Sequence, residues 1–88
     1  MEKIVLNGLT MLSRERAHDE IAHALSLPEW YGRNLDALFD LASTMKADVI
    51  LTDCDAMLDS LGSYGELLIA ALQEASEANP DFSFEKRA

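Results

Sequence analysis

Two aspartates four positions apart carry the most informative chemistry of this sequence. Asp36 and Asp40 follow Asn34, a favoured helix-capping residue, and their spacing places them on one face of a helix. Like charges at this spacing repel each other by roughly 0.2–0.5 kcal/mol in an isolated helix. Trp30 and Gly32 come shortly before, and tryptophan beside acidic residues is typical of the centre of an interface. The pattern indicates either a binding surface that presents two carboxylates or an ordinary solvated helix face.

The helix expected over residues 35–45 has a packing face and a separate polar face. At about 100° per residue, the packing face spans about 120° and comprises Leu35, Leu38, Leu41, Ala42 and Met45. Phe39 lies at the border of this apolar stripe. Asp36, Asp40 and Ser43 lie together on the side away from the core. A carboxylate-hydroxyl surface therefore remains free to meet a partner.

A second pair of aspartates follows the strand expected over residues 48–52. Asp53 and Asp55 resemble the strand-Asp-x-Asp motif of haloacid-dehalogenase-type phosphotransferases, which work with magnesium. That chemistry needs further loops and a phosphate-binding lysine, which 88 residues barely accommodate. We therefore expect these aspartates to cap the next helix.

The spacing of the histidines and the single cysteine matches no catalytic or metal-binding motif. His18 and His23 are five positions apart, about 140° around a helix, which suits neither a metal pair nor a catalytic dyad. We expect both at the surface or at its boundary, and Cys54 as a small buried hydrophobe. The sequence thus predicts no catalytic residues, no metal, no cofactor and no enzymatic activity.

Composition and charge define the class of protein and of partner. The 88 residues predict one domain over 1–88, and 16 acidic against 7 basic residues give a net charge of −9. Such a charge argues against direct nucleic-acid binding and against anionic membranes. A basic protein is the natural partner for it, although the charge taken alone is better explained by solubility. One cysteine, no secretory signal and no apolar span predict a soluble cytoplasmic protein.

Apolar runs, caps and breakers predict seven elements. Strands are expected at 4–6, 48–52 and 82–84, and helices at about 14–25, 35–45, 56–61 and 65–78. Strands separated by helical crossovers pair in parallel. The predicted fold class is therefore α/β, with the order β-α-α-β-α-α-β and a three-stranded parallel sheet.

One segment carries a specific family resemblance. Residues 27–40 resemble the signature of the barstar family, intracellular inhibitors of secreted bacterial ribonucleases, and they read LPEWYGRNLDALFD. The element order also agrees with that family along the chain. The resemblance implies a two-layer fold with sheet order 1-2-3, and an inhibitor that blocks a nuclease active site with this loop and helix.

The resemblance also assigns roles to individual residues. Asp40 would enter the site that holds an RNA phosphate, Asp36 would pair with a neighbouring cation, and Trp30 would pack on the nuclease. Glu74 lines up with a further acidic contact, with Glu77 as the competing choice. The other implied partner-binding residues are Gly32, Asn34, Leu35, Phe39, Ser43 and Met45.

The implied partner is a basic, extracellular-type ribonuclease or a related nuclease toxin, bound by a monomer as a 1:1 complex. A carboxylate mimics phosphate because it is anionic and accepts paired hydrogen bonds from arginine. Phe39 and Met45 stand where family members can carry tryptophan, and Arg33 adds a positive charge beside the acidic face. These departures leave open an acidic module that binds a different toxin or a non-nuclease protein through the same helix.

Overall fold

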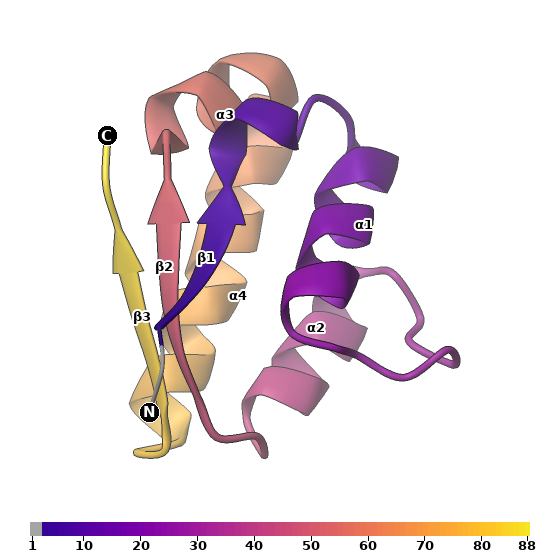
Figure 1. Ribbon diagram of the computed structural model, residues 1–88, viewed down its shortest axis with the longest axis vertical. Helices are drawn as coiled ribbons and strands as arrows, with labels where there is room; N and C mark the ends of the chain where they lie inside the picture. Colours follow the sequence, from indigo (N-terminus) through magenta and orange to yellow (C-terminus); the bar gives the residue numbers. More distant parts are fainter. Residues whose placement is uncertain (1–2) are drawn as a thin grey trace.

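The computed structural model describes residues 3–88 as a three-stranded parallel sheet covered by helices on one face (Figure 1). Strands β1 (Lys3–Asn7), β2 (Ala47–Thr52) and β3 (Phe82–Lys86) lie in the order β1-β2-β3. In the register, Val5 stands opposite Ile50, which stands opposite Glu85. The α/β class, the parallel pairing and the sheet order predicted from the sequence are confirmed.

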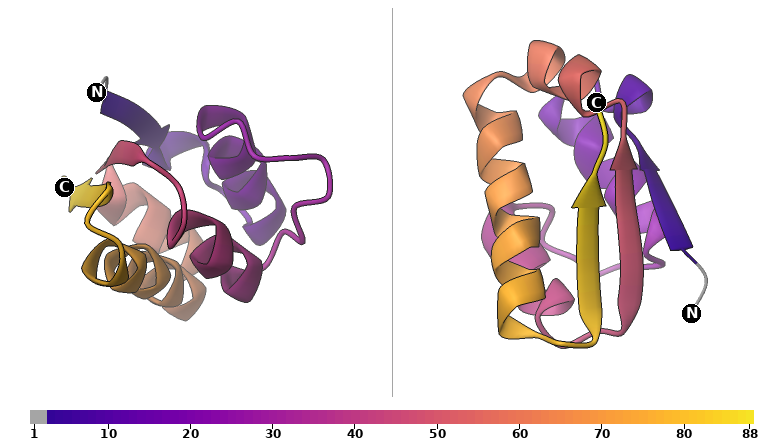
Figure 2. Two further views of the ribbon diagram at one scale, coloured as in Figure 1. Left: turned by 90° about the horizontal axis from the view of Figure 1, so that it is seen from below. Right: turned by 90° about the vertical axis from the view of Figure 1, so that its left-hand side faces the viewer.

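The helices form the second layer. Helices α1 (Arg14–Ala24), α2 (Leu35–Ala42) and α4 (Ser63–Ala78) lie on one side of the sheet, as the two turned views show (Figure 2). The short helix α3 (Cys54–Leu61) lies at the end of the sheet where β1 and β2 finish (Figure 1). Helix α2 packs chiefly against α4, so the candidate binding helix is supported by a neighbouring helix.

The core fills the space between the two layers. Its largest fully buried side chains come from the sheet, from helices α1 to α4 and, for Met11, from the segment before α1: Leu6, Met11, Ile21, Leu38, Val49, Leu51, Met57, Leu68, Leu72 and Phe82. Burying a side chain of this size contributes about 1.5–3 kcal/mol relative to leaving it in water. The packing face predicted for α2 is confirmed, because Leu38 and Ala42 are buried and Leu35, Leu41 and Met45 pack partly buried against the core.

Helix α2 is shorter than its apolar pattern predicts. It ends at Ala42 rather than near residue 45. The Asn79 side chain donates to the carbonyls of Ala42, at 3.1 Å, and of Met45, at 2.8 Å, and so occupies acceptors at this end. The hydroxyls of Ser43 and Thr44 donate to backbone carbonyls three residues earlier. Such local bonds compete with continued helix.

The predicted boundary of α3 is also wrong, because the helix begins at Cys54 instead of residue 56. The amide of Cys54 donates to the carbonyl of Arg87 at 2.9 Å, a contact from the far end of the chain. Asp53 occupies the cap position with φ of 51°, but its side chain makes no capping hydrogen bond, and Asp55 lies inside the first turn. The capping role expected of these two aspartates is therefore not observed.

Other element bounds differ from the expected ones by one or two residues, and one short element was not expected. Helix α4 starts two residues before the expected position, directly after Gly62, whose φ of 58° suits glycine. Strand β3 extends to Lys86, and its exposed polar end belongs to an edge strand. A short 3₁₀ helix, η1 (Gly8–Thr10), follows β1. It was not predicted, because three residues are too few to show a helical spacing of apolar residues.

Candidate functional site

The N-terminus of α2 is built by Asn34. Its side-chain oxygen accepts from the amide of Ala37 at 2.8 Å, and its side-chain nitrogen donates to the carbonyl of Gly32 at 3.2 Å. A Cβ on Gly32 would lie 3.2 Å from that nitrogen and 3.3 Å from the Cβ of Ala37. The loop therefore passes close to the first turn of the helix, and a side chain at position 32 would crowd it.

Helices α2 and α4 enclose an open groove of about 560 Å³. We call it the acidic groove; its lining residues are Leu35, Asp36, Phe39, Asp40, Leu67, Ala70, Ala71 and Glu74. Three carboxylates border a surface made otherwise of apolar side chains. The structure thus brings Asp36, Asp40 and Glu74 together, whereas Glu77 does not line the groove.

No protein cation neutralises the acidic groove within residues 3–88. The two ion pairs in this part of the chain join Arg33 to Asp19 and Arg87 to Glu85. Asp36, Asp40 and Glu74 are exposed and take part in neither. Their negative charges are therefore available to a cationic partner.

The remaining predicted contact residues lie at the two ends of α2. Trp30 is 75% exposed on the loop before the helix, although it is a large aromatic side chain. Ser43 and Met45 follow the helix instead of belonging to it, and the Ser43 hydroxyl donates to the Asp40 carbonyl at 2.9 Å. The predicted surface of two carboxylates and a hydroxyl is therefore only partly observed, because the Ser43 hydroxyl donates its hydrogen bond to the backbone carbonyl of Asp40.

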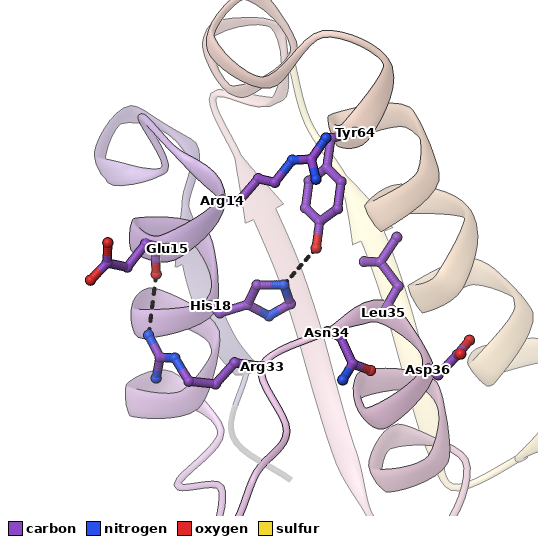
Figure 3. Close-up of a pocket in the computed structure, with 8 residues that line it drawn as sticks. All are labelled: Arg14, Glu15, His18, Arg33, Asn34, Leu35, Asp36 and Tyr64. Atoms are coloured by element: carbon purple, nitrogen blue, oxygen red, sulfur yellow. Dashed lines mark hydrogen bonds between the residues drawn. The ribbon is translucent and has the colours of Figure 1, made fainter.

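Arg33 lies at a second hollow, between α1, α4 and the start of α2. This pocket is lined by Arg14, Glu15, His18, Arg33, Asn34, Leu35, Asp36 and Tyr64 (Figure 3). Arg33 extends toward α1, where it pairs with Asp19 and donates to the carbonyl of Glu15 at 3.3 Å. The positive charge expected beside the acidic face is therefore directed away from Asp40 and partly offset by Asp19.

His18 contradicts its predicted position at the surface. Its side chain is 2% exposed, and its two ring nitrogens lie 2.7 Å from the hydroxyls of Tyr31 and Tyr64. Burial, with the nearby Arg33 charge, lowers the pKa of His18. Burial and the neighbouring Tyr64 raise the pKa of Tyr31 to about 12. The spacing of His18 from Ile21, at i+3, was the sequence signal for this burial.

The positions of the other histidine and of the cysteine agree with the sequence expectations. His23 is exposed and Cys54 is buried, both as predicted, and burial raises the pKa of the Cys54 thiol. Over residues 3–88, no three or more histidine, cysteine or acidic side chains are placed to hold a metal ion. In the same part of the chain, no helix has the length and apolarity needed to cross a membrane.

Comparison with known proteins agrees with this geometry. The family model described as "Barstar (barnase inhibitor)" matches residues 1–86. The chain belongs to the barstar family. One relative, "Putative ribonuclease inhibitor YrdF" of Bacillus subtilis (strain 168), is 33% identical over 84 residues, which cover 92% of each chain.

Membership of the barstar family confirms the resemblance drawn from residues 27–40. The motif that carries it forms the first six residues of α2, which contribute four lining residues to the acidic groove, and the loop before that helix. By its description the family is one of inhibitors, and its two-layer architecture was predicted together with the resemblance. The acidic groove is therefore the candidate binding surface of this barstar-family chain.

Proposed function

We propose that this chain is a non-enzymatic inhibitor that binds a basic bacterial ribonuclease as a 1:1 complex and covers its active site. One observation carries the proposal: Asp36, Asp40 and Glu74 border one groove, and no cation of residues 3–88 pairs with them. The family description names an inhibitor of barnase, and the Bacillus relative is named as a ribonuclease inhibitor, which supports the same direction.

The active site of a ribonuclease must hold an RNA phosphate, and a carboxylate resembles phosphate in charge and in its acceptors. Asp40 lies in the second turn of α2, on the exposed side of the helix, and enters the phosphate position. Asp36 and Glu74 pair with neighbouring arginine or lysine side chains. Leu35 and Phe39 contact the aliphatic parts of those side chains along the apolar wall of the groove.

The loop and the far end of α2 extend the contact. Trp30 packs on the nuclease surface, since a tryptophan exposed to this degree buries a large area on binding. Gly32 permits close approach of the loop, with Asn34 holding the helix start. Ser43 and Met45 supply contacts at the other end. The net charge of −9 accelerates the encounter with a basic nuclease, most strongly at low salt.

The biological setting follows from the type of partner. A secreted ribonuclease is a danger to the cell that makes it, so an inhibitor acts as an antitoxin or immunity protein in the cytoplasm. Cys54 is a buried free thiol that forms no disulfide, as expected in that reducing compartment.

Inhibition of RNA cleavage tests the proposal. The chain is titrated into barnase and, separately, into any basic secreted ribonuclease encoded beside it. We expect cleavage to stop at one inhibitor per nuclease. We expect Asp40→Ala to weaken binding the most, by about 30-fold to several thousand-fold, because truncating one member of a buried charge pair costs about 2–5 kcal/mol.

The control lies one turn further along α4. Glu77→Ala removes the same charge from the same helix outside the acidic groove, so Glu74→Ala is expected to weaken binding more. Full cleavage by both nucleases at large inhibitor excess would overturn the proposal and favour a non-nuclease partner. An Asp40→Ala variant that folds and binds within twofold of wild type would overturn the role of Asp40.

A further inference from the structure

A buried histidine bridges three segments of the protein beside the acidic groove. Nδ1 of His18, on α1, lies 2.7 Å from the Tyr31 hydroxyl, and Nε2 lies 2.7 Å from the Tyr64 hydroxyl on α4. A neutral imidazole has one donor and one acceptor, so one hydroxyl donates to it and the other accepts from it. We call these three residues the His18 bridge.

Tyr31 is the member of the His18 bridge that lies in the loop between α1 and α2. It follows Trp30, which is 75% exposed, and precedes Gly32, whereas its own side chain is only 5% exposed. The segment between α1 and α2 forms no helix or strand. Within it, the amide of Tyr31 donates to the carbonyl of Pro28 at 3.0 Å. The buried phenol of Tyr31 thus fastens this irregular loop to the core, beside the partly buried Leu27 and the contacts of Arg33 with α1.

We propose that His18 is a positioning residue for partner recognition, holding Tyr31 and thereby Trp30 and Gly32 in place beside Asp36 and Asp40. The inference rests on the proposed inhibitor function and adds a residue that touches no partner itself. A loop already held in its bound conformation loses less entropy on association, so the same contacts give higher affinity.

Burial of the bridge favours a neutral imidazole, and the positive charge of Arg33 on the loop acts in the same direction, whereas Asp19 on α1 opposes it. Arg14 and Glu15 of α1 and Asp36 of α2 line the same pocket. The Arg14 guanidinium lies over the Tyr64 ring, 4.3 Å from its centre, and helps to hold that tyrosine. Each nitrogen of His18 already meets a hydroxyl, so the orientation of the ring is fixed from both sides.

The first test measures the loop without any partner. Amide ¹⁵N relaxation gives order parameters for residues 29–33 in wild type, Tyr31→Phe, Tyr64→Phe and His18→Gln. Rigid backbone gives values near 0.85 and flexible backbone values below about 0.6. We expect the largest decrease in Tyr31→Phe, a smaller one in Tyr64→Phe and partial retention in His18→Gln. His23→Gln, an exposed histidine on the same helix, is expected to match wild type.

The second test measures inhibition of barnase by the same variants. Losing one hydrogen bond of the bridge is expected to raise Kd by about 2- to 12-fold in Tyr31→Phe, the range that corresponds to one net hydrogen bond. Asp40→Ala is the contrasting variant, since it removes a contact while the order parameters of the loop stay unchanged. Tyrosine-to-phenylalanine changes keep the ring that packs in the core, so the variants are expected to fold.

Each outcome decides a separate point. Unchanged order parameters in Tyr31→Phe and His18→Gln would overturn the inference, whatever the nuclease assay gives. A loosened loop with wild-type affinity would also overturn it. If the wild-type chain inhibits neither barnase nor the neighbouring ribonuclease, the proposed function is refuted, and with it the role of His18 in recognition. The relaxation data would still decide separately whether His18 holds the loop.

Discussion

Asn79 is the residue whose replacement we expect to weaken most clearly the attachment of α2 to the rest of the protein. It follows α4, 8% exposed, and its side chain makes three hydrogen bonds. The amide nitrogen donates to the carbonyls of Ala42 at 3.1 Å and Met45 at 2.8 Å, and the amide oxygen accepts from Asp81 at 3.0 Å. One side chain thus joins the end of α2 to the turn before β3.

The expected magnitude follows from these three bonds. A typical intramolecular hydrogen bond contributes about 0.5–1.5 kcal/mol net, so losing the three in Asn79→Ala is expected to lower the free energy of unfolding by about 1.5–4.5 kcal/mol. Asn79→Asp should cost at least as much, although the two side chains have the same shape. The carboxylate keeps the acceptor for Asp81 but places negative charge against the carbonyls of Ala42 and Met45.

Urea unfolding followed by circular dichroism measures these differences. Ser76→Ala is the control, because it deletes an exposed local bond to the Gln73 carbonyl and is expected to change the free energy of unfolding by less than about 0.5 kcal/mol. An Asn79→Asp variant as stable as wild type would refute the reasoning, since the donated bonds could then contribute nothing.

Two further perturbations test packing elsewhere in the fold, at buried His18 and at Gly8 beside the end of β2. Because burial lowers the pKa of folded His18, the unfolded chain is protonated first as pH falls through about 6.5. Stability is therefore lost from there down to the lowered folded pKa, and His18→Gln should flatten this part of the pH dependence whereas His23→Gln should not. In Gly8→Ala, the new Cβ would lie 2.3 Å from the Asp53 carbonyl oxygen, so the backbone must shift. A thermal melt should show destabilisation of about 1–3 kcal/mol, and an unchanged melting temperature would contradict the expected clash.

The parts of the fold that were predictable are those decided by nearby residues. Ser13 caps α1 through a bond to the Arg16 amide, and Asn34 caps α2 through Ala37, both within one turn. The apolar run over 48–52 forms the central strand, with Ile50 only 5% exposed on the face that no helix covers. Period and cap chemistry determine such features locally, so they were available from the sequence.

The features that escaped prediction depend on residues far apart in sequence. The end of α2 involves Asn79, more than 30 positions away, and the start of α3 involves the carbonyl of Arg87. The spacing of His18 from Ile21 indicates burial locally, but its hydrogen-bond partners Tyr31 and Tyr64 lie 13 and 46 positions away and no local pattern reveals them. The candidate site divides in the same way. The helical period placed Asp36 and Asp40 on one face, whereas the position of Glu74 came from the family resemblance.

The three carboxylates of the acidic groove explain why its helix needs anchors at both ends. Asp36, Asp40 and Glu74 repel one another, and no cation within residues 3–88 forms an ion pair with them. An eight-residue helix has little stability of its own, so this repulsion must be opposed by tertiary contacts. Asn79 fixes one end and, in our proposal, the His18 bridge fixes the loop at the other. A cationic partner would relieve the repulsion without moving the helix. The unfavourable free energy of bringing the three carboxylates together is already part of folding, so their attraction to the partner's cations would contribute fully to the free energy of binding.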